Sequence, residues 1–173
     1  MEVAVEQKVV ATDSSLPLLD DQNELLRGLN RAGKYISPKY FYDERGSELF
    51  SQIMRLPEYY LTRTEANILH DKRSEIASYT GQDCLLIEPG AGNCEKITYL
   101  LESIRPKVFY PQDISTDFLV KTAEQLKQQF SWLDVKPIIG DFHDEIIIPN
   151  DYPEKKRVVF YPGSTIGNFD PVS

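Results

Sequence analysis

Residues 85 to 96 carry the sequence LLIEPGAGNCEK, in which a short apolar run leads into a turn with two glycines, preceded by an acid and followed by a lysine. Glycines let a ligand approach the backbone closely, and a helix that begins after such a turn offers N–H groups and a partial positive charge. We therefore expect a polar or anionic ligand here, in contact with Gly90 and Lys96. The alternative is a plain tight turn, with Lys96 on a solvated face.

The kind of ligand follows from what the turn lacks. A phosphate-binding loop requires G-x-x-x-x-G-K-[ST], which is absent, and a dinucleotide-binding turn requires a third glycine where this chain has Glu95. Glu88, directly before the turn, would also repel a phosphate. A group that carries both an ammonium and a carboxylate suits these charges better, and the methionyl end of S-adenosylmethionine is such a group.

Two later apolar runs end in residues that extend this candidate site. Asp113 could accept hydrogen bonds from both hydroxyls of a ribose, or the following helix could be capped by Asp113 or by Ser115. Asp141 and Phe142 could hold an exocyclic amine and an adenine ring, or they could belong to the core. Because parallel strands bind ligands at their carboxyl ends, we expect Glu88, Asp113 and Asp141 to lie along one edge of a sheet.

The second half of the chain has the pattern of an α/β domain. Four short apolar runs, each ending in Pro, Gly or Asp, predict buried strands: CLLIEP, KVFYPQD, VKPIIGD and RVVFYPG. Helical spacing predicts two helices between them, through Ile97, Leu100, Leu101 and Ile104 and through Phe118, Leu119, Thr122 and Leu126. The alternation of strand and helix predicts a parallel sheet with right-handed crossovers.

The first half of the chain is predicted to be helical. Short amphipathic helices are expected in DQNELLRGLNR and in SELFSQIMRL, which places Leu56 on the helical face, with a loop SPKYFYDERG between them. A third helix, running to about Tyr79, begins at a capping box formed by Thr62 and Glu65.

These patterns predict three segments. Residues 1–17 form a loosely held arm, residues 18–80 a helical segment that contributes to a substrate site, and residues 81–173 the first half of a ligand-binding α/β domain.

Composition narrows the class of partner. The chain has 173 residues with 27 acids against 19 bases, a formal net charge of -8, which opposes binding to nucleic acid or to an anionic membrane surface. It contains no secretion signal and no long apolar span, so we expect a cytoplasmic protein with a small-molecule ligand. Cys84 and Cys94 have no metal or redox spacing and are expected to be buried thiols, and no metal site is predicted from the two histidines.

Several motifs, in order from about residue 33 to the end, resemble the histidine Nα-methyltransferase family of ergothioneine biosynthesis. They are PKYFYDERGSELFSQIMRLPEYYLTRTEANIL, EPGAGNCEK, GDF and GSTIGNFDP. The resemblance implies a Rossmann-like class I methyltransferase fold, with S-adenosylmethionine as the cofactor and histidine as the substrate.

By this resemblance, two sets of residues acquire expected roles. The cofactor would be bound by Gly90, Lys96, Asp113, Asp141 and Phe142, and the amino-acid substrate by Tyr42, Tyr59 and Asn168. Methyl transfer is an in-line displacement that requires alignment and exclusion of water, so no metal is needed. No residue is assigned as the proton acceptor.

The chains of this family extend well beyond the position that corresponds to Ser173, so we expect a fragment whose sheet is truncated after about the fourth strand. RVVFY would then be an exposed apolar edge, open to pairing with a complementing C-terminal chain. Three hypotheses follow: an N-methyltransferase acting on histidine, an inactive or split nucleotide-binding piece, and an NAD-dependent oxidoreductase.

Overall fold

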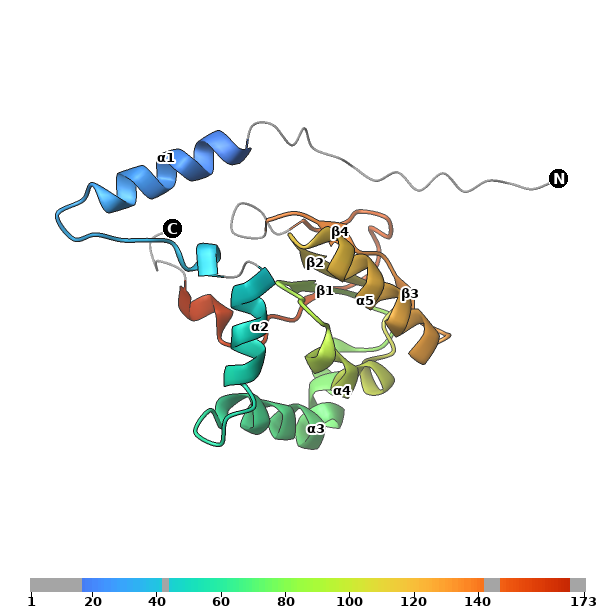
Figure 1. Cartoon of the computed structure of the whole chain (residues 1–173). Helices are drawn as coiled ribbons and strands as arrows, with labels where there is room; N and C mark the ends of the chain where they lie inside the picture. Colours follow the sequence, from blue (N-terminus) through green and yellow to red (C-terminus); the bar gives the residue numbers. More distant parts are fainter. Residues whose placement is uncertain (1–16, 42–43, 142–146, 169–173) are drawn as a thin grey trace. The chain divides into compact units, whose positions relative to one another are not determined.

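In the computed structural model, which describes residues 17–41, 44–141 and 147–168, the chain divides into two units, Met1–Ile53 and Met54–Ser173. The described part of the first unit contains α1 (Pro17–Leu29), the short 3-10 helix η1 (Pro38–Phe41) and α2 (Glu44–Ile53), drawn from blue to teal in Figure 1.

The bounds of α2 correct two expectations. The helix begins at Glu44, inside the segment that was expected to be a loop, because one glycine within a helix, here Gly46, costs only about 1 kcal/mol. It ends at Ile53 and therefore does not include Leu56. Leu56 directly precedes Pro57, and a residue in that position is sterically disfavoured from the helical conformation.

A parallel sheet forms the centre of the second unit (Figure 1). Its strands are β1 (Leu85–Pro89), β2 (Val108–Asp113), β3 (Asp134–Val135), β4 (Ile138–Ile139) and β5 (Arg157–Val159). The order is β3-β2-β1-β5, with β4 also pairing with β2. The helices are α3 (Leu61–Thr80), α4 (Glu95–Ile104), α5 (Thr116–Gln129) and the 3-10 helix η2 (Thr165–Asn168).

The predicted third strand is divided in two. β3 and β4 both pair with β2, but Lys136 and Pro137 between them belong to neither strand. Proline has no N–H group to donate, so it interrupts the ladder of hydrogen bonds at this point. The other three predicted strands are confirmed. Among the described residues β5 lies at the edge of the sheet, and Val159 is 45% exposed, as expected for RVVFY, but Val158 and Phe160 pack against the apolar core.

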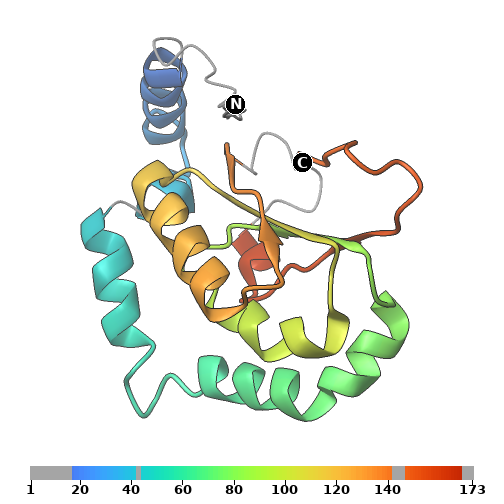
Figure 2. The same cartoon turned by 90° about the vertical axis from the view of Figure 1, so that its right-hand side faces the viewer.

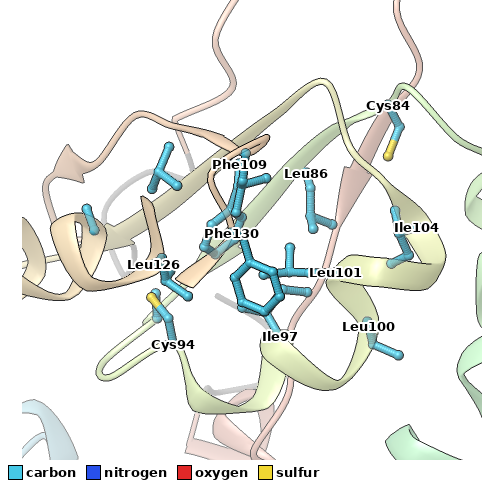
Figure 3. Close-up of a cluster of buried hydrophobic side chains, with 14 of the residues drawn as sticks. Cys84, Leu86, Cys94, Ile97, Leu100, Leu101, Ile104, Phe109, Leu126 and Phe130 are labelled. Carbon is cyan, nitrogen blue, oxygen red and sulfur yellow. The ribbon is translucent and has the colours of Figure 1, made fainter. Parts of the chain in front are cut away.

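Helices α4 and α5 cover one face of the sheet, and α3 packs on α4 (Figure 2). The core between them is apolar, and Figure 3 shows part of it. Its fully buried side chains include Leu86, Ile97, Leu100, Leu101, Phe109 and Leu119. Phe118, predicted to share this face, is instead exposed on α5, because the buried stripe of that helix runs through Leu119, Thr122, Ala123 and Leu126. Cys84 and Cys94 are buried free thiols, as predicted.

The opposite face of the sheet buries Leu85, Ile87, Val108 and Tyr110. The Tyr110 hydroxyl donates to Asp151 Oδ2 at 3.1 Å, and the same oxygen accepts from Lys136 Nζ at 2.8 Å. Burial, reinforced by the Asp151 carboxylate, raises the pKa of Tyr110. These bonds hold the segment before β5 against this face of the sheet.

Trp132 joins the far ends of α4 and α5. Its Nε1 donates to Glu102 Oε1 at 3.2 Å, the Arg105 guanidinium lies 4.2 Å from the ring centroid, and the Phe130 ring meets it edge to face at 6.0 Å.

None of the helices in the described ranges is long and apolar enough to cross a membrane.

We predict that Leu101→Ala lowers the free energy of unfolding by about 2–5 kcal/mol, because Leu101 is fully buried between α4 and the sheet and its loss leaves a cavity. Leu61→Ala is the matched control, since Leu61 is 53% exposed at the start of α3, and should change stability by less than about 0.5 kcal/mol. Urea unfolding followed by circular dichroism measures both. Equal losses of unfolding free energy in the two variants would mean that Leu101 does not belong to the core.

Candidate functional site

The glycine turn follows β1 and has a backbone that only glycine adopts easily. Gly90 has φ 64° and Gly92 has φ 51°, both in the left-handed region. A Cβ atom placed on Gly92 would meet no other atom within 4 Å, so the space beside this residue is open. Cys94, which caps α4, is left-handed as well, with φ 51°. The turn therefore presents its backbone to an open space, as the sequence predicted for a ligand-binding turn.

The neighbouring strand β2 holds this turn in place. Ala91 N donates to the Gln112 carbonyl oxygen at 3.0 Å, and Gly92 N donates to Asp113 Oδ2 at 3.0 Å. The other carboxylate oxygen of Asp113 accepts from Ser115 N at 3.0 Å, just before α5. Asp113 thus combines a capping-type bond with a bond to the glycine turn. The cap residue Ser115 makes no side-chain capping bond itself.

Lys96, in the first turn of α4, is not on a solvated face. Its Nζ lies 2.7 Å from Glu65 Oε2, and the two side chains are 27% and 29% exposed. Glu65 Oε1 accepts from Gly163 N at 2.7 Å. The capping box predicted for Thr62 and Glu65 is therefore wrong. α3 begins at Leu61, its cap residue Tyr60 makes no side-chain capping bond, and Thr62 lies inside the helix.

Glu88 is a buried acid at the carboxyl end of β1. It is 2% exposed, and its Oε2 has no hydrogen-bond partner among the described residues. Burial raises its pKa well above 4.5. The positive charge of Lys96 opposes this rise and the negative charge of Glu65 adds to it. Burial, reinforced by the charges of Glu88 and Asp113, also raises the pKa of Cys94. Glu88 is therefore an acceptor, or a proton carrier, with an unused oxygen beside the turn.

The end of β4 lies next to the end of β2, because Asp113 pairs with Ile139 and Gly140 N donates to the Asp113 carbonyl oxygen at 3.2 Å. Asp141 follows directly and is half-buried. This arrangement brings Glu88, Asp113 and Asp141 to one edge of the sheet, as the strand pattern predicted. Phe142 lies outside the described residues, so its predicted role stays a prediction.

The three predicted substrate residues are less fully described. Tyr59 is half-buried in the turn before α3, and its N–H donates to the Leu56 carbonyl oxygen at 3.1 Å. Asn168 is the last residue of η2, and its side chain is not among those described. Tyr42 lies outside the described residues.

Two residues near the turn have roles that the sequence analysis did not assign. Glu65 was interpreted only as a cap, and its long-range bonds carry no local signature. Gln112 is fully buried in β2, and its Oε1 accepts from Ile147 N at 3.1 Å, which ties the segment after β4 to the sheet. A polar residue in an otherwise apolar strand run was the available signal for Gln112.

The strand order places β1 beside both β2 and β5, with crossover helices on one face, which is the first half of a doubly wound Rossmann-like sheet. The glycine turn, Asp113 and Asp141 lie at its carboxyl edge, where such folds bind nucleotide-containing ligands. The chain belongs to a family described as histidine-specific, S-adenosylmethionine-dependent methyltransferases, whose model matches residues 21–173.

Curated relatives agree with this assignment. A histidine N-alpha-methyltransferase of Mycobacterium tuberculosis is 39% identical over 87% of this chain and 47% of its own length. One of Mycolicibacterium smegmatis is 38% identical over 94% of this chain and 50% of its own. A 4-dimethylallyltryptophan N-methyltransferase of Claviceps purpurea is 28% identical over 91% of this chain and 46% of its own. The chain thus spans about half the length of each of these three relatives.

Glu88 should make stability depend on pH in a definite direction. Its pKa is raised in the folded chain, so above about pH 4.5 the unfolded chain releases a proton that the folded chain keeps, and stability falls as pH rises. Glu88→Gln removes this penalty. We expect the variant to gain stability over the unmodified chain at about pH 7.5 and to lose most of that gain at about pH 4.

Urea unfolding at the two pH values measures the gain. Glu124→Gln is the matched control, because Glu124 is exposed on α5, and its difference from the unmodified chain should stay nearly constant. A Glu88→Gln difference that is equally independent of pH would show that folding does not raise the pKa of Glu88.

Proposed function

We propose that this chain binds S-adenosylmethionine at the glycine turn and forms part of an N-methyltransferase that acts on the α-amino group of histidine. The observation that carries the proposal is the hydrogen bond from Gly92 N to Asp113 Oδ2, because it joins the glycine turn to the acid predicted to bind ribose. The membership of the chain in a family described as dependent on this cofactor supports the same conclusion.

The charges of the described residues fit the two ends of this cofactor. Lys96 has three N–H donors and gives one to Glu65, so it has donors for a ligand carboxylate. The Glu88 Oε2, which has no partner among the described residues, can accept from an ammonium. Each oxygen of Asp113 accepts one hydrogen bond from a backbone N–H and has a second lone pair for a ribose hydroxyl. The open space beside Gly92 allows the ligand to approach the backbone.

The cofactor supplies a methyl group on a positively charged sulfur, which an amine can displace in line. The task left to the chain is to orient a neutral amine and exclude water. We infer that Tyr59 and Asn168, with Tyr42, bind the amino acid, because Tyr59 precedes the helix that carries Glu65 and Asn168 ends the loop that Glu65 contacts. The mycobacterial relatives named for histidine support this substrate.

A second candidate is a nucleotide-binding piece that requires a further chain for turnover. It is favoured by the position of β5, whose outer edge pairs with no strand among the described residues and whose Val159 is 45% exposed. An unpaired parallel edge can accept a strand from another chain. Cofactor binding without methyl transfer would support this candidate. NAD(H) binding in place of S-adenosylhomocysteine would support an oxidoreductase instead.

The activity test incubates the chain with S-adenosylmethionine and histidine and follows methylated histidine by mass spectrometry. Tryptophan in place of histidine is the control substrate, because one relative is named for a tryptophan derivative. Transfer to histidine alone would support the proposed function in full. Transfer to neither, with cofactor bound, would favour the second candidate.

The cofactor site is tested by Asp113→Ala. Loss of both carboxylate oxygens removes the predicted ribose acceptor and frees the glycine turn, so we expect S-adenosylhomocysteine to bind about 1–3 kcal/mol more weakly. Calorimetric titration measures the affinity. Asp117→Ala, an exposed acid in the first turn of α5, is the matched control and should bind like the unmodified chain. Unchanged affinity in Asp113→Ala would leave Asp113 with only a structural role.

A further inference from the structure

We propose that Glu65 is a positioning residue that couples Lys96, in the cofactor site, to the loop Gly163–Asn168, in the substrate site. The functional part of this inference rests on the proposed function. Glu65 would touch neither ligand and would act through the two groups that its carboxylate holds.

The two oxygens of Glu65 have separate partners from distant parts of the chain. Oε2 lies 2.7 Å from Lys96 Nζ on α4, and Oε1 accepts from Gly163 N, after β5, at 2.7 Å. One side chain of α3 therefore bridges the helix that follows the glycine turn and the loop that follows the edge strand. Movement of either partner changes the position of the carboxylate that holds the other.

The loop that Glu65 holds has an unusual backbone. Gly163 has φ 83° and Ser164 has φ 59°, both left-handed, and Gly167 N donates to the Ser164 carbonyl oxygen at 2.9 Å. A serine rarely adopts this conformation, and such residues persist where surrounding contacts hold them. The bond from Gly163 N to Glu65 is such a contact, and it precedes the turn that ends at Asn168.

A charged ligand at the glycine turn would perturb the ion pair between Lys96 and Glu65. Lys96 is paired with Glu65, and its positive charge also acts on the buried carboxyl of Glu88, whose Oε2 has no hydrogen-bond partner among the described residues. A ligand carboxylate bound to one of the remaining donors of Lys96 would share its positive charge, weaken the ion pair with Glu65 and shift the Glu65 carboxylate. Because the same carboxylate binds Gly163, the shift reaches the loop. A weaker ion pair with Lys96 leaves the Glu65 carboxylate a stronger acceptor for Gly163 N, so the cofactor favours the ordered loop. By reciprocity, a substrate that orders the loop strengthens cofactor binding.

The first experiment needs no ligand. Amide hydrogen exchange and the ¹H–¹⁵N chemical shift of Gly163 are compared in the unmodified chain, Lys96→Met, Glu65→Gln and the double variant. Glu65→Gln keeps an oxygen that accepts from Gly163 but removes the charge that binds Lys96. We expect Lys96→Met to shift the Gly163 signal in the unmodified background and to have little effect in the Glu65→Gln background. Equal shifts in both backgrounds, or none in either, would overturn the proposal.

The matched control is Glu75→Gln. Glu75 lies on the same helix and binds an exposed lysine, Lys72, at 3.1 Å, so its loss tests for a general effect of removing an acid from α3. The Gly163 signal should not change in this variant. A change as large as that in Lys96→Met would mean that the loop responds to α3 as a whole, which would also overturn the proposal. Circular dichroism confirms that each variant is folded.

The second experiment measures coupling between the ligands. S-adenosylhomocysteine is titrated calorimetrically with and without histidine, and we expect histidine to raise its affinity at least about fivefold in the unmodified chain and less than about twofold in Glu65→Ala. Coupling that persists in Glu65→Ala, or that is absent from a chain that binds both ligands, would overturn the proposal. Failure of the unmodified chain to bind S-adenosylhomocysteine would count against the proposed function, and the Gly163 amide would still decide the role of Glu65.

Discussion

The central position of β1 is the constraint on which the candidate site depends. All five residues of this strand are buried, and it pairs in parallel with β2 on one side and β5 on the other. Its carboxyl end is therefore placed by two neighbours at once. Glu88 lies opposite Pro111, and Pro89 lies opposite Gln112, so a slip of one residue in this pairing would separate the glycine turn from Asp113.

Backbone groups, more than side chains, define the shape of the turn. Ala91 and Gly92 donate to groups on β2, and the glycines supply the left-handed angles. Side chains supply the charge. Glu65 is paired with Lys96, and Glu88 is buried with an Oε2 that has no partner among the described residues. The backbone thus fixes the shape of the site, while these side chains set its charge. Such a division suits the proposed binding and release of a zwitterionic group.

The strands, the glycine turn and Asp113 were predictable because each has a local signature. Apolar runs that end in turn residues mark β1 and β2, and helical spacing marks α4. Pro137 was a local signal for the division of β3 from β4, although the apolar run on both sides obscured it. Glu65 could not be predicted, because TRTE matches a capping box locally and its partners are on α4 and beyond β5. Exposure of Phe118 likewise depends on which stripe of α5 meets the sheet.

The fluorescence of Trp132 can report on the candidate site, although Trp132 lies at the opposite end of the sheet. Trp132 is the single tryptophan of the chain, and its contacts with Glu102 and Arg105 lie at the carboxyl end of α4, whereas the glycine turn lies at the start of that helix. Indole emission responds to nearby charge and to hydrogen bonding at Nε1. A change in fluorescence when a ligand is added would therefore report that the carboxyl end of α4 responds to binding at its start, and a constant spectrum would report that this end of the helix stays anchored.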